Sequence, residues 1–267
     1  VARGFDSSRI LTVDVNLSGT RYREAPQQRA FTDAVSADIA AAPGVTAVSV
    51  VTQLPLTGTG SLSALSAEGK SLPNPERPSA DVRSVSPSYF RAMGLPLKTG
   101  RLFEGADRER NVTVLSERLA ERGWPGENPL GKRLRFGLNP TAVVYEVIGT
   151  VGDIRGTSLD QPVSPTGYVP FPQRSNFSGG TTFIVKTTGD PAAVSPIVRQ
   201  AIRTNDPELP IGAFRTMDDV IDNSLAAHRF QLLLVSFFAI LAALLASVGV
   251  YGVMTYSVEQ RAGEIGI

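Results

Sequence analysis

The sequence contains no cysteine and one histidine, His228. Without cysteine there can be no disulfide, no thiolate metal site and no cysteine nucleophile. A Ser-His-Asp triad or a histidine metal site would depend on His228, which stands beside Arg229 at the edge of a long apolar stretch. An amphipathic side chain lies comfortably at such an edge. We therefore expect no catalytic residue, no metal site, no cofactor and no enzyme activity in this chain.

The chain also lacks an excess of either charge, because it contains 26 Lys and Arg and 25 Asp and Glu, which gives a net charge of +1. No stretch combines dense basic residues with aromatic ones, so nucleic acid is not an expected partner. The acidic residues predict a solvated face rather than an acid/base pair; they are Asp107, Glu109, Glu117, Glu121 and Glu127. Either solubility or an acidic partner explains the neighbouring cations, which are Arg101, Arg108, Arg110, Lys132, Arg133 and Arg135.

No charged residue occurs among the 29 residues between Arg229 and Glu259. The 24 residues from Phe230 to Val253 would rise about 36 Å as a helix, and a membrane span needs about 20 apolar residues. A buried helix of a soluble core is the alternative, but such helices are usually shorter and keep a polar stripe. We expect a transmembrane helix over residues 230–256.

No proline follows Pro210, so one helix is expected to run from Met217 to Val258. Thr216, with Asp219 three residues on, resembles a helix-start cap. Residues 216–229 would form a stalk above the membrane, and residues 257–267 would begin a cytoplasmic loop. Because the chain begins at Val1 and stops at Ile267 without a polar tail, we expect a fragment of a longer membrane protein.

Two β-α-β units are predicted, one near each end of the extramembrane part. Residues 10–17 alternate apolar and polar side chains, a helical pattern follows Pro26, and residues 45–51 form a second strand. Residues 181–187, a helix after Asp190-Pro191 and residues 211–214 repeat this order. We expect Ser195 to cap the regular part of that second helix. The two units predict one sheet covered by two helices.

Between the two units lies an insert over about residues 57–176, in which short strands alternate with Gly/Pro turns. Residues 57–63 and 72–78 are predicted loops. Short helices are expected at 87–93, capped by Ser86, and at 117–122, capped by Ser116. Strands are expected at 111–115, 133–136, 143–151 and 167–171. The fold class is therefore α+β, a split α/β subdomain with a mainly β subdomain inserted.

Residues 126–132 nearly match the phosphate loop of nucleotide-binding proteins. Arg133 stands where a hydroxyl should contact the magnesium ion, and Pro129 removes one of the backbone donors that hold phosphate. A turn that leads into the hairpin explains the stretch better than nucleotide binding does.

Small residues lie on one side of the apolar helix and are predicted to pack against other membrane helices. They are Ala239, Ala242, Ala243, Ala246 and Ser247. Small side chains at four-residue spacing allow helices to approach closely where lipid supplies no hydrophobic drive. The alternative is that alanine is simply common in helices.

Several stretches together resemble the periplasmic core domain of MacB-type ABC transporter permeases. They are SPSYFRAMGLPL from Ser86, GRLF from Gly100, WPGENPLGKRL from Trp124 and VIGTVGDIR from Val147. The final EQRAGEIGI, from Glu259, resembles the cytoplasmic segment that follows the second membrane helix in the MacB/FtsX superfamily. In detail the chain is most similar to large permeases of this type that occur duplicated in soil bacteria such as acidobacteria.

The resemblance implies a porter-like α/β subdomain (1–56 and 177–215), an inserted sabre-like β subdomain (57–176) and the second membrane helix. It also implies a bacterial inner membrane protein with residues 1–229 periplasmic or extracellular. Expected partners are a cytoplasmic ABC ATPase that hydrolyses ATP, a second permease copy and the lipid bilayer, with a periplasmic adaptor protein as a further candidate. The segment expected to face the ATPase contains Glu259, Arg261, Glu264 and Ile265.

The resulting functional hypothesis is mechanotransmission, in which cytoplasmic ATP hydrolysis changes the conformation of the periplasmic part and drives efflux or export. The alternative is a periplasmic module that binds or senses a peptide, a lipoprotein or an antibiotic. A third possibility, an anchored enzyme, is disfavoured because the sequence lacks the usual triads and metal ligands.

Overall fold

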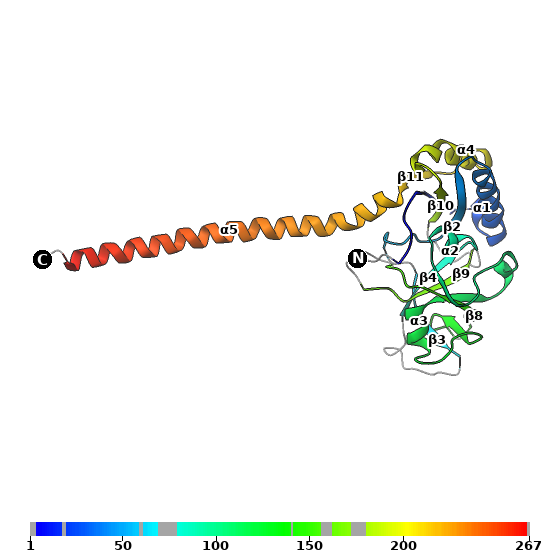
Figure 1. Cartoon of the computed structure of the whole chain (residues 1–267), viewed down its shortest axis with the longest axis horizontal. Helices are drawn as coiled ribbons and strands as arrows, with labels where there is room; N and C mark the ends of the chain where they lie inside the picture. The colour runs from blue at the N-terminus through cyan, green and yellow to red at the C-terminus, as the bar shows by residue number, and fades with distance from the viewer. Residues whose placement is uncertain are drawn as a thin grey trace. The chain divides into compact units, whose positions relative to one another are not determined.

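The structure is a computed structural model that describes residues 4–17, 20–58, 61–68, 79–139, 141–155, 162–171 and 180–265 (Figure 1). Within these ranges, the side chains of residues 20, 225–233 and 251–265 are not described. The chain divides into two units, Val1–Ser224 and Leu225–Ile267.

Eleven strands and five α-helices make up the described elements. The strands are β1 (Ile10–Val15), β2 (Val45–Val51), β3 (Ser61–Ala67), β4 (Ser79–Val85), β5 (Leu97–Gly100), β6 (Val112–Ser116), β7 (Arg133–Phe136), β8 (Val144–Val151), β9 (Thr166–Pro170), β10 (Thr181–Thr187) and β11 (Ile211–Thr216). The α-helices are α1 (Ala25–Ala40), α2 (Tyr89–Ala92), α3 (Glu117–Gly123), α4 (Ser195–Asn205) and α5 (Met217–Ile265). Short 3₁₀ turns are η1 (Thr20–Tyr22), η3 (Gly105–Glu109) and η4 (Pro191–Val194).

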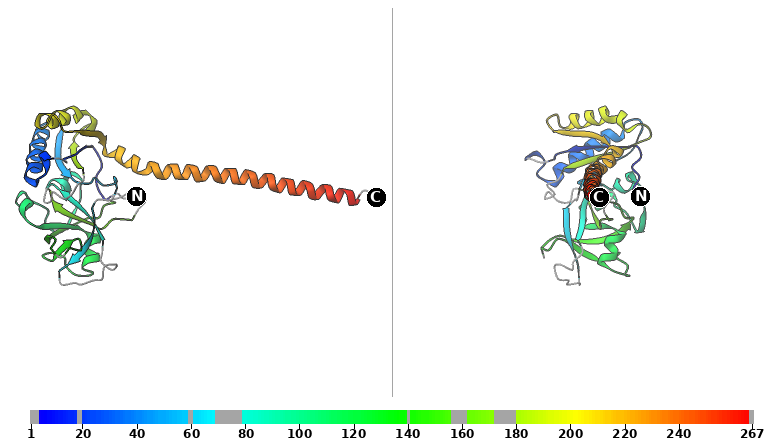
Figure 2. Two further views of the ribbon diagram at one scale, coloured as in Figure 1. Left: turned by 180° about the vertical axis from the view of Figure 1, so that it is seen from behind. Right: turned by 90° about the vertical axis from the view of Figure 1, so that its left-hand side faces the viewer.

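The two predicted β-α-β units interlock in one sheet of order β11-β1-β10-β2, in which each neighbouring pair is antiparallel. Each unit therefore supplies a strand that lies between the two strands of the other. Helices α1 and α4 pack side by side on one face of this sheet (Figures 1 and 2). The core between them includes Val13, Val35, Phe183 and Val198. The prediction of a sheet covered by two helices is confirmed.

The insert forms a closed barrel in the strand order β4-β3-β7-β8-β6-β9, which a parallel pairing of β4 with β9 completes. Its interior is apolar and contains Leu65, Val82, Leu134 and Tyr145, together with Trp124 just beyond α3. A closed barrel leaves no free strand edge within its ring. The barrel joins the first sheet through one pairing of β2 with β4, at Val51 and Val85.

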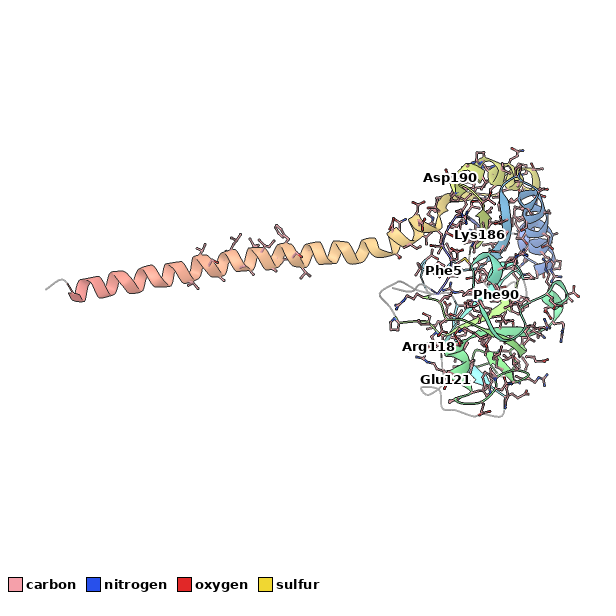
Figure 3. All side chains as sticks on the ribbon, viewed as in Figure 1. Phe5, Phe90, Arg118, Glu121, Lys186 and Asp190 are labelled. Carbon is pink, nitrogen blue, oxygen red and sulfur yellow. The ribbon has the colours of Figure 1, made fainter. Side chains whose placement is uncertain are left out.

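A third core lies where the sheet and the barrel meet. It takes Val51 and Ile184 from the sheet, Phe90 and Met93 from and just after α2, and Tyr168 from the barrel strand β9. Figure 3 labels Phe90 in this middle region, between Lys186 on β10 and Arg118 on α3. The side chain of Phe90 packs edge-on against the Tyr168 ring, with centroids 5.2 Å apart. This central core connects the two halves of the first unit.

Three sequence predictions for the insert were wrong in detail. Strand β3 begins at Ser61, inside the stretch predicted as a loop over 57–63, and strands β4 and β5 were missed altogether. Helix α2 spans four residues and has Ser88 at its cap position. The hydroxyl of Ser86 instead accepts a hydrogen bond from the backbone N–H of Val50, so this serine ties the turn to β2. The predicted loop at 72–78 lies outside the described residues.

Of the two serine caps predicted for α3 and α4, the first is present and the second is not. Ser116 accepts a hydrogen bond from the N–H of Leu119 at the start of α3, as predicted. Ser195 does not cap α4, because the helix already includes it and its cap residue is Val194. Asp190 instead accepts a hydrogen bond from the N–H of Ala192 and caps the 3₁₀ turn η4 that leads into α4.

Helix α5 is longer than predicted, because it continues to Ile265. The predicted cytoplasmic loop over residues 257–267 is therefore helical through Ile265. No helix in the part of the chain that the structure describes is both long enough and apolar enough to cross a membrane. Within the predicted membrane segment, residues 230–233 and 251–256 lie outside those whose side chains are described, so that segment stays a prediction.

Candidate functional site

The start of α5 is held by a reciprocal pair of side-chain contacts. The backbone N–H and the hydroxyl of Thr216 donate to Oδ2 of Asp219 at 2.9 and 2.7 Å, and the N–H of Asp219 donates to Oγ1 of Thr216 at 3.1 Å. These bonds satisfy backbone donors that a helix start leaves without an intrahelical partner. The cap predicted from Thr216 and Asp219 is present.

The first two turns of α5 are built into the central core of the first unit. Met217 has no exposed surface, and Val220 and Ile221 are 3% and 4% exposed. All three belong to the same apolar cluster as Phe90 and Val51. A displaced helix start must therefore displace close-packed neighbours, because interiors of this density transmit strain. We call residues 216–221 the anchor of α5.

Removing the cap should weaken the anchor measurably. We expect Asp219→Ala to lower the free energy of unfolding by about 1 kcal/mol at pH 7, as for other lost helix caps. Urea unfolding of the wild-type and variant chains in detergent micelles would measure the difference. Asp218→Ala, a neighbouring exposed position outside the cap, serves as the control. An equal loss in both variants would contradict the assignment.

The same cap predicts a dependence on pH. Hydrogen bonds from the hydroxyl and the backbone of Thr216 lower the pKa of Asp219 below its ordinary value of 3.8. A lowered pKa stabilises the fold above the unfolded-state pKa of about 4, and this contribution disappears as the pH falls through the folded-state pKa. The stability difference between wild type and Asp219→Ala should shrink as the pH is lowered below about 4.

The stretches that carry the family resemblance converge around β8. Gly100 on β5 pairs with Gly149 on β8, and the N–H of Arg101 donates to the carbonyl oxygen of Ile148 at 3.0 Å. The N–H of Gly131, in the turn before β7, donates to the carbonyl oxygen of Val147 at 2.8 Å. The N–H of Gly152 donates to the carbonyl oxygen of Pro96, in the stretch from Ser86, at 3.0 Å, so all four quoted stretches form one backbone junction. The phosphate-loop-like residues 126–132 belong to it as a turn.

One of the acidic residues predicted on a solvated face is buried. Asp107 is 1% exposed and accepts hydrogen bonds from Arg101 Nη1 and Nη2 at 2.5 and 2.9 Å. These hydrogen bonds from Arg101 hold the pKa of Asp107 below its ordinary value, although burial acts in the opposite direction. Asp107 therefore fixes the loop after β5, and the solvated-face prediction was wrong for this residue.

A buried ion pair lies on β4, which the sequence analysis missed. Arg83 has no exposed side-chain surface and donates through Nε and Nη2 to Oδ2 of Asp81, at 3.0 and 2.7 Å. The two residues are two positions apart on one strand and therefore share a face. Burial raises the pKa of the neighbouring Tyr89 to about 12. Because both side chains are buried, a substitution that removes either partner of the ion pair is expected to destabilise the fold strongly.

A cavity of about 460 Å³ lies beside α1 in the first unit. Its lining comes from α1, from β2, from Arg91 on α2 and from Arg108 on η3. Among the predicted cations, Arg108 thus lines a cavity and pairs with Asp33 at 2.6 Å. Lys132 and Arg133 pair with Glu127 and Glu68 instead.

The predicted helix-packing residues are all exposed within the chain by itself, and the structure contains nothing that tests their packing. They are Ala239, Ala242, Ala243, Ala246 and Ser247. The hydroxyl of Ser247 donates to the carbonyl oxygen of Ala243 at 2.8 Å, within its own helix. The side chains of His228, Glu259, Arg261, Glu264 and Ile265 lie outside the described ones. Among the described residues, no group of three potential metal ligands occurs.

Sequence reasoning found the cap of α5 but not its buried side chains. Met217, Val220 and Ile221 follow the spacing i, i+3, i+4, which marks the core-facing stripe of a helix. That signal could have separated the anchor from the rest of α5. Nothing local could have identified the cavity, because its two arginines come from different elements.

Comparison with known proteins identifies the family. The model of the MacB-like periplasmic core domain matches residues 1–204. A macrolide export ATP-binding/permease protein MacB of Aggregatibacter actinomycetemcomitans is 29% identical over 207 residues, which cover 71% of this chain and 30% of that protein. A probable syringafactin export ATP-binding/permease protein SyfD of Pseudomonas syringae is 26% identical over 70% of this chain and 29% of that protein. The chain spans less than a third of these relatives.

Solved structures show the same fold. The crystal structure of the periplasmic region of MacB from Actinobacillus actinomycetemcomitans covers 83% of this chain and 94% of that one, with a TM-score of 0.55 and 20% identity. A domain of a putative permease protein from Porphyromonas gingivalis covers 79% and 91%, with a TM-score of 0.51 and 18% identity. Both matches show that the chain shares the α+β fold of these domains. On the match to residues 1–204, the chain belongs to the family of MacB-like periplasmic core domains of ABC transporter permeases.

Proposed function

We propose that the chain is the periplasmic domain and one membrane helix of a permease that couples cytoplasmic ATP hydrolysis to conformational change in the periplasm for export. The observation that carries this proposal is the anchor: α5 begins with Met217, Val220 and Ile221 inside the central core and continues as a helix to Ile265. A helix is a stiff element, so a movement along it acts on the core that holds its first two turns.

The proposal includes the surroundings of α5. Residues 230–256 would cross the bacterial inner membrane, with residues 1–229 on its outer side. The stripe of small residues from Ala239 to Ser247 would contact helices of the same permease or of a second copy. The segment from Glu259 to Ile265 would lie near an ATPase subunit, and a periplasmic adaptor would be a further partner. The names of the relatives, which combine ATP-binding with permease, support an ATPase partner.

An insertion in α5 tests the transmission. In the assembled transporter, seven Gly/Ser residues placed between Asn223 and Ser224 should uncouple the periplasmic domain from ATP hydrolysis, because a flexible segment cannot carry the movement. Since the chain has no cysteine, Glu121→Cys provides a single site for a spin label on the exposed side of α3. We expect the ATP-dependent change in the label's spectrum to disappear while ATP hydrolysis continues.

Seven helix-forming residues, such as an Ala/Glu/Lys sequence, are the matched control. Seven residues turn a helix by about 700°, which nearly restores the original face, and such residues keep it stiff. This variant should retain most of the ATP-dependent change. A Gly/Ser variant that responds to ATP as the wild type does would overturn the proposal.

A second candidate function is the binding of a peptide, lipoprotein or antibiotic by the periplasmic part. The specific observation in its favour is the cavity beside α1, whose volume of about 460 Å³ lies within the range of ligand pockets. Saturable binding by the chain, unchanged in the Gly/Ser variant, would separate this function from transmission.

A further inference from the structure

The cavity beside α1 lies where the sheet subdomain meets the insert. Helix α1 contributes Asp33 and the neighbouring small side chains of Ser36, Ala37 and Ala40, and β2 contributes residues 45–48. Arg91 reaches it from α2, and Arg108 from η3, in the loop region of the insert. The lining therefore combines parts of the chain that are far apart in sequence, and its shape depends on how they are held together.

The charges in this cavity do not balance. The lining contains two arginines and a single acidic residue, Asp33. Nη1 of Arg108 donates to Oδ2 of Asp33 at 2.6 Å. In the described part of the chain, the exposed guanidinium group of Arg91 has no hydrogen bond and no ion pair, and the buried Nε of Arg108 has no hydrogen-bond partner. One positive charge and at least one buried donor are thus left for an outside acceptor.

The rest of the lining suits a small molecule. The exposed lining is mostly polar, and the methyl and isopropyl groups of Ala37, Ala40, Val45 and Val48 provide a smaller apolar part next to the two guanidinium groups. The hydroxyl of Thr46 already donates to the carbonyl oxygen of Lys186 at 3.1 Å, so it competes little for a ligand. Arginine forks match the paired oxygens of carboxylate and phosphate groups.

From these observations we infer that the cavity binds a small organic anion, with its carboxylate or phosphate group on Arg91 and Arg108 and its apolar body between α1 and β2. The Asp33–Arg108 pair does not prevent this, because both side chains are partly exposed, at 48% and 30%, and such pairs hold weakly. The inference extends the second candidate function and does not depend on transmission by α5.

Isothermal titration of the whole chain in lipid nanodiscs with sodium benzoate tests the inference. Benzoate combines a carboxylate with a compact apolar body, benzamide is its uncharged counterpart, and inorganic phosphate is an anion without that body. We expect saturable benzoate binding that Arg91→Gln weakens about tenfold or more, as expected when one charge-assisted hydrogen bond is lost. Benzamide should bind at least about tenfold more weakly than benzoate.

Two further variants make the result specific. Arg122→Gln removes an exposed arginine of α3 that does not line the cavity, and it should bind benzoate as the wild type does. Ala37→Leu fills the cavity from an exposed helix position that accepts leucine, and it should abolish binding without unfolding the chain. Trp124 fluorescence, from the barrel core, would check that each variant is folded.

The outcomes are distinct. Phosphate binding that also depends on Arg91 would support the site and identify free phosphate as a source of the anion. The inference is overturned if neither anion binds saturably, if benzamide binds as tightly as benzoate, or if Arg122→Gln weakens binding as much as Arg91→Gln. None of these outcomes bears on the insertion experiment in α5.

Discussion

Replacing Asp81 with alanine is expected to lower the free energy of unfolding by about 3–5 kcal/mol, because it removes one partner of a buried ion pair. Arg83 has no exposed side-chain surface. Burial is the largest single influence and lowers the pKa of Arg83, but the Asp81 carboxylate together with Tyr89 and Tyr168 raises it above its ordinary value, so the residue is charged in the folded chain. Arg83 Nη1 also donates a hydrogen bond to the carbonyl oxygen of Gln53, a neutral group, at 3.2 Å.

Urea unfolding followed by the fluorescence of Trp124 would measure this loss. Trp124 is the single tryptophan of the sequence and lies 2% exposed in the barrel core. Glu121→Ala, at an exposed position of α3, should change the unfolding free energy by less than about 0.5 kcal/mol.

The double variant Asp81→Leu with Arg83→Met separates the cost of an unpaired charge from the value of the pair. Replacing both partners by apolar residues of similar volume is often neutral or stabilising. We therefore expect the double variant to recover most of the stability lost in Asp81→Ala. A double variant as unstable as the single one would show that the pair contributes through its specific geometry and would contradict the unpaired-charge explanation.

The second large effect is expected at Gly149, where β8 crosses the backbone of the β5 loop. A Cβ atom at this position would overlap the carbonyl oxygen of Arg101, a backbone atom that cannot rotate away. We expect Gly149→Ala to lower the free energy of unfolding by about 3 kcal/mol, the upper end of typical overpacking costs. The same urea measurement, read from Trp124, would report it.

Gly105 offers the matched control, because a Cβ atom there would meet no atom within 4 Å. Gly105→Ala should leave the unfolding free energy within about 0.5 kcal/mol of the wild type. If Gly149→Ala were as harmless as Gly105→Ala, the close backbone approach between β5 and β8 would not exist in solution.

The secondary-structure elements that could be predicted from the sequence are those with a clear pattern of apolar residues. Residues 10–15 and 181–187 are buried strands with alternating or continuous apolar side chains, and both were predicted nearly to the residue. Strand β4 was missed because it includes Asp81 and Arg83, and charged residues normally indicate a solvent-exposed segment. Here both side chains are buried because they form an ion pair with each other. Strand β3 was missed because its serines and alanines resemble a loop.

For the functional region, local chemistry was enough for one part only. The Thr216 and Asp219 cap lies within four residues, so the spacing revealed it. The central core, by contrast, brings Met217 together with Phe90 and Tyr168, and such contacts depend on the strand order of the whole unit. The cavity could not be predicted locally either, because Arg91 and Arg108 line it only through the tertiary fold, which brings both of them next to α1.

The interlocked sheet has a consequence for how the chain folds. Strand β1 pairs with β10 in a register that joins Ile10 to Lys186, and β10 in turn separates β1 from β2. Non-local pairings of this kind form slowly, because the chain loses the entropy of closing a long loop before the stabilising contacts form. During synthesis from the N-terminus, β1 and β2 are made long before β10. Their strand edges therefore stay unpaired until residues 181–187 have been synthesised. Meanwhile the barrel, formed by residues 61–170, has all of its strands and can assemble first.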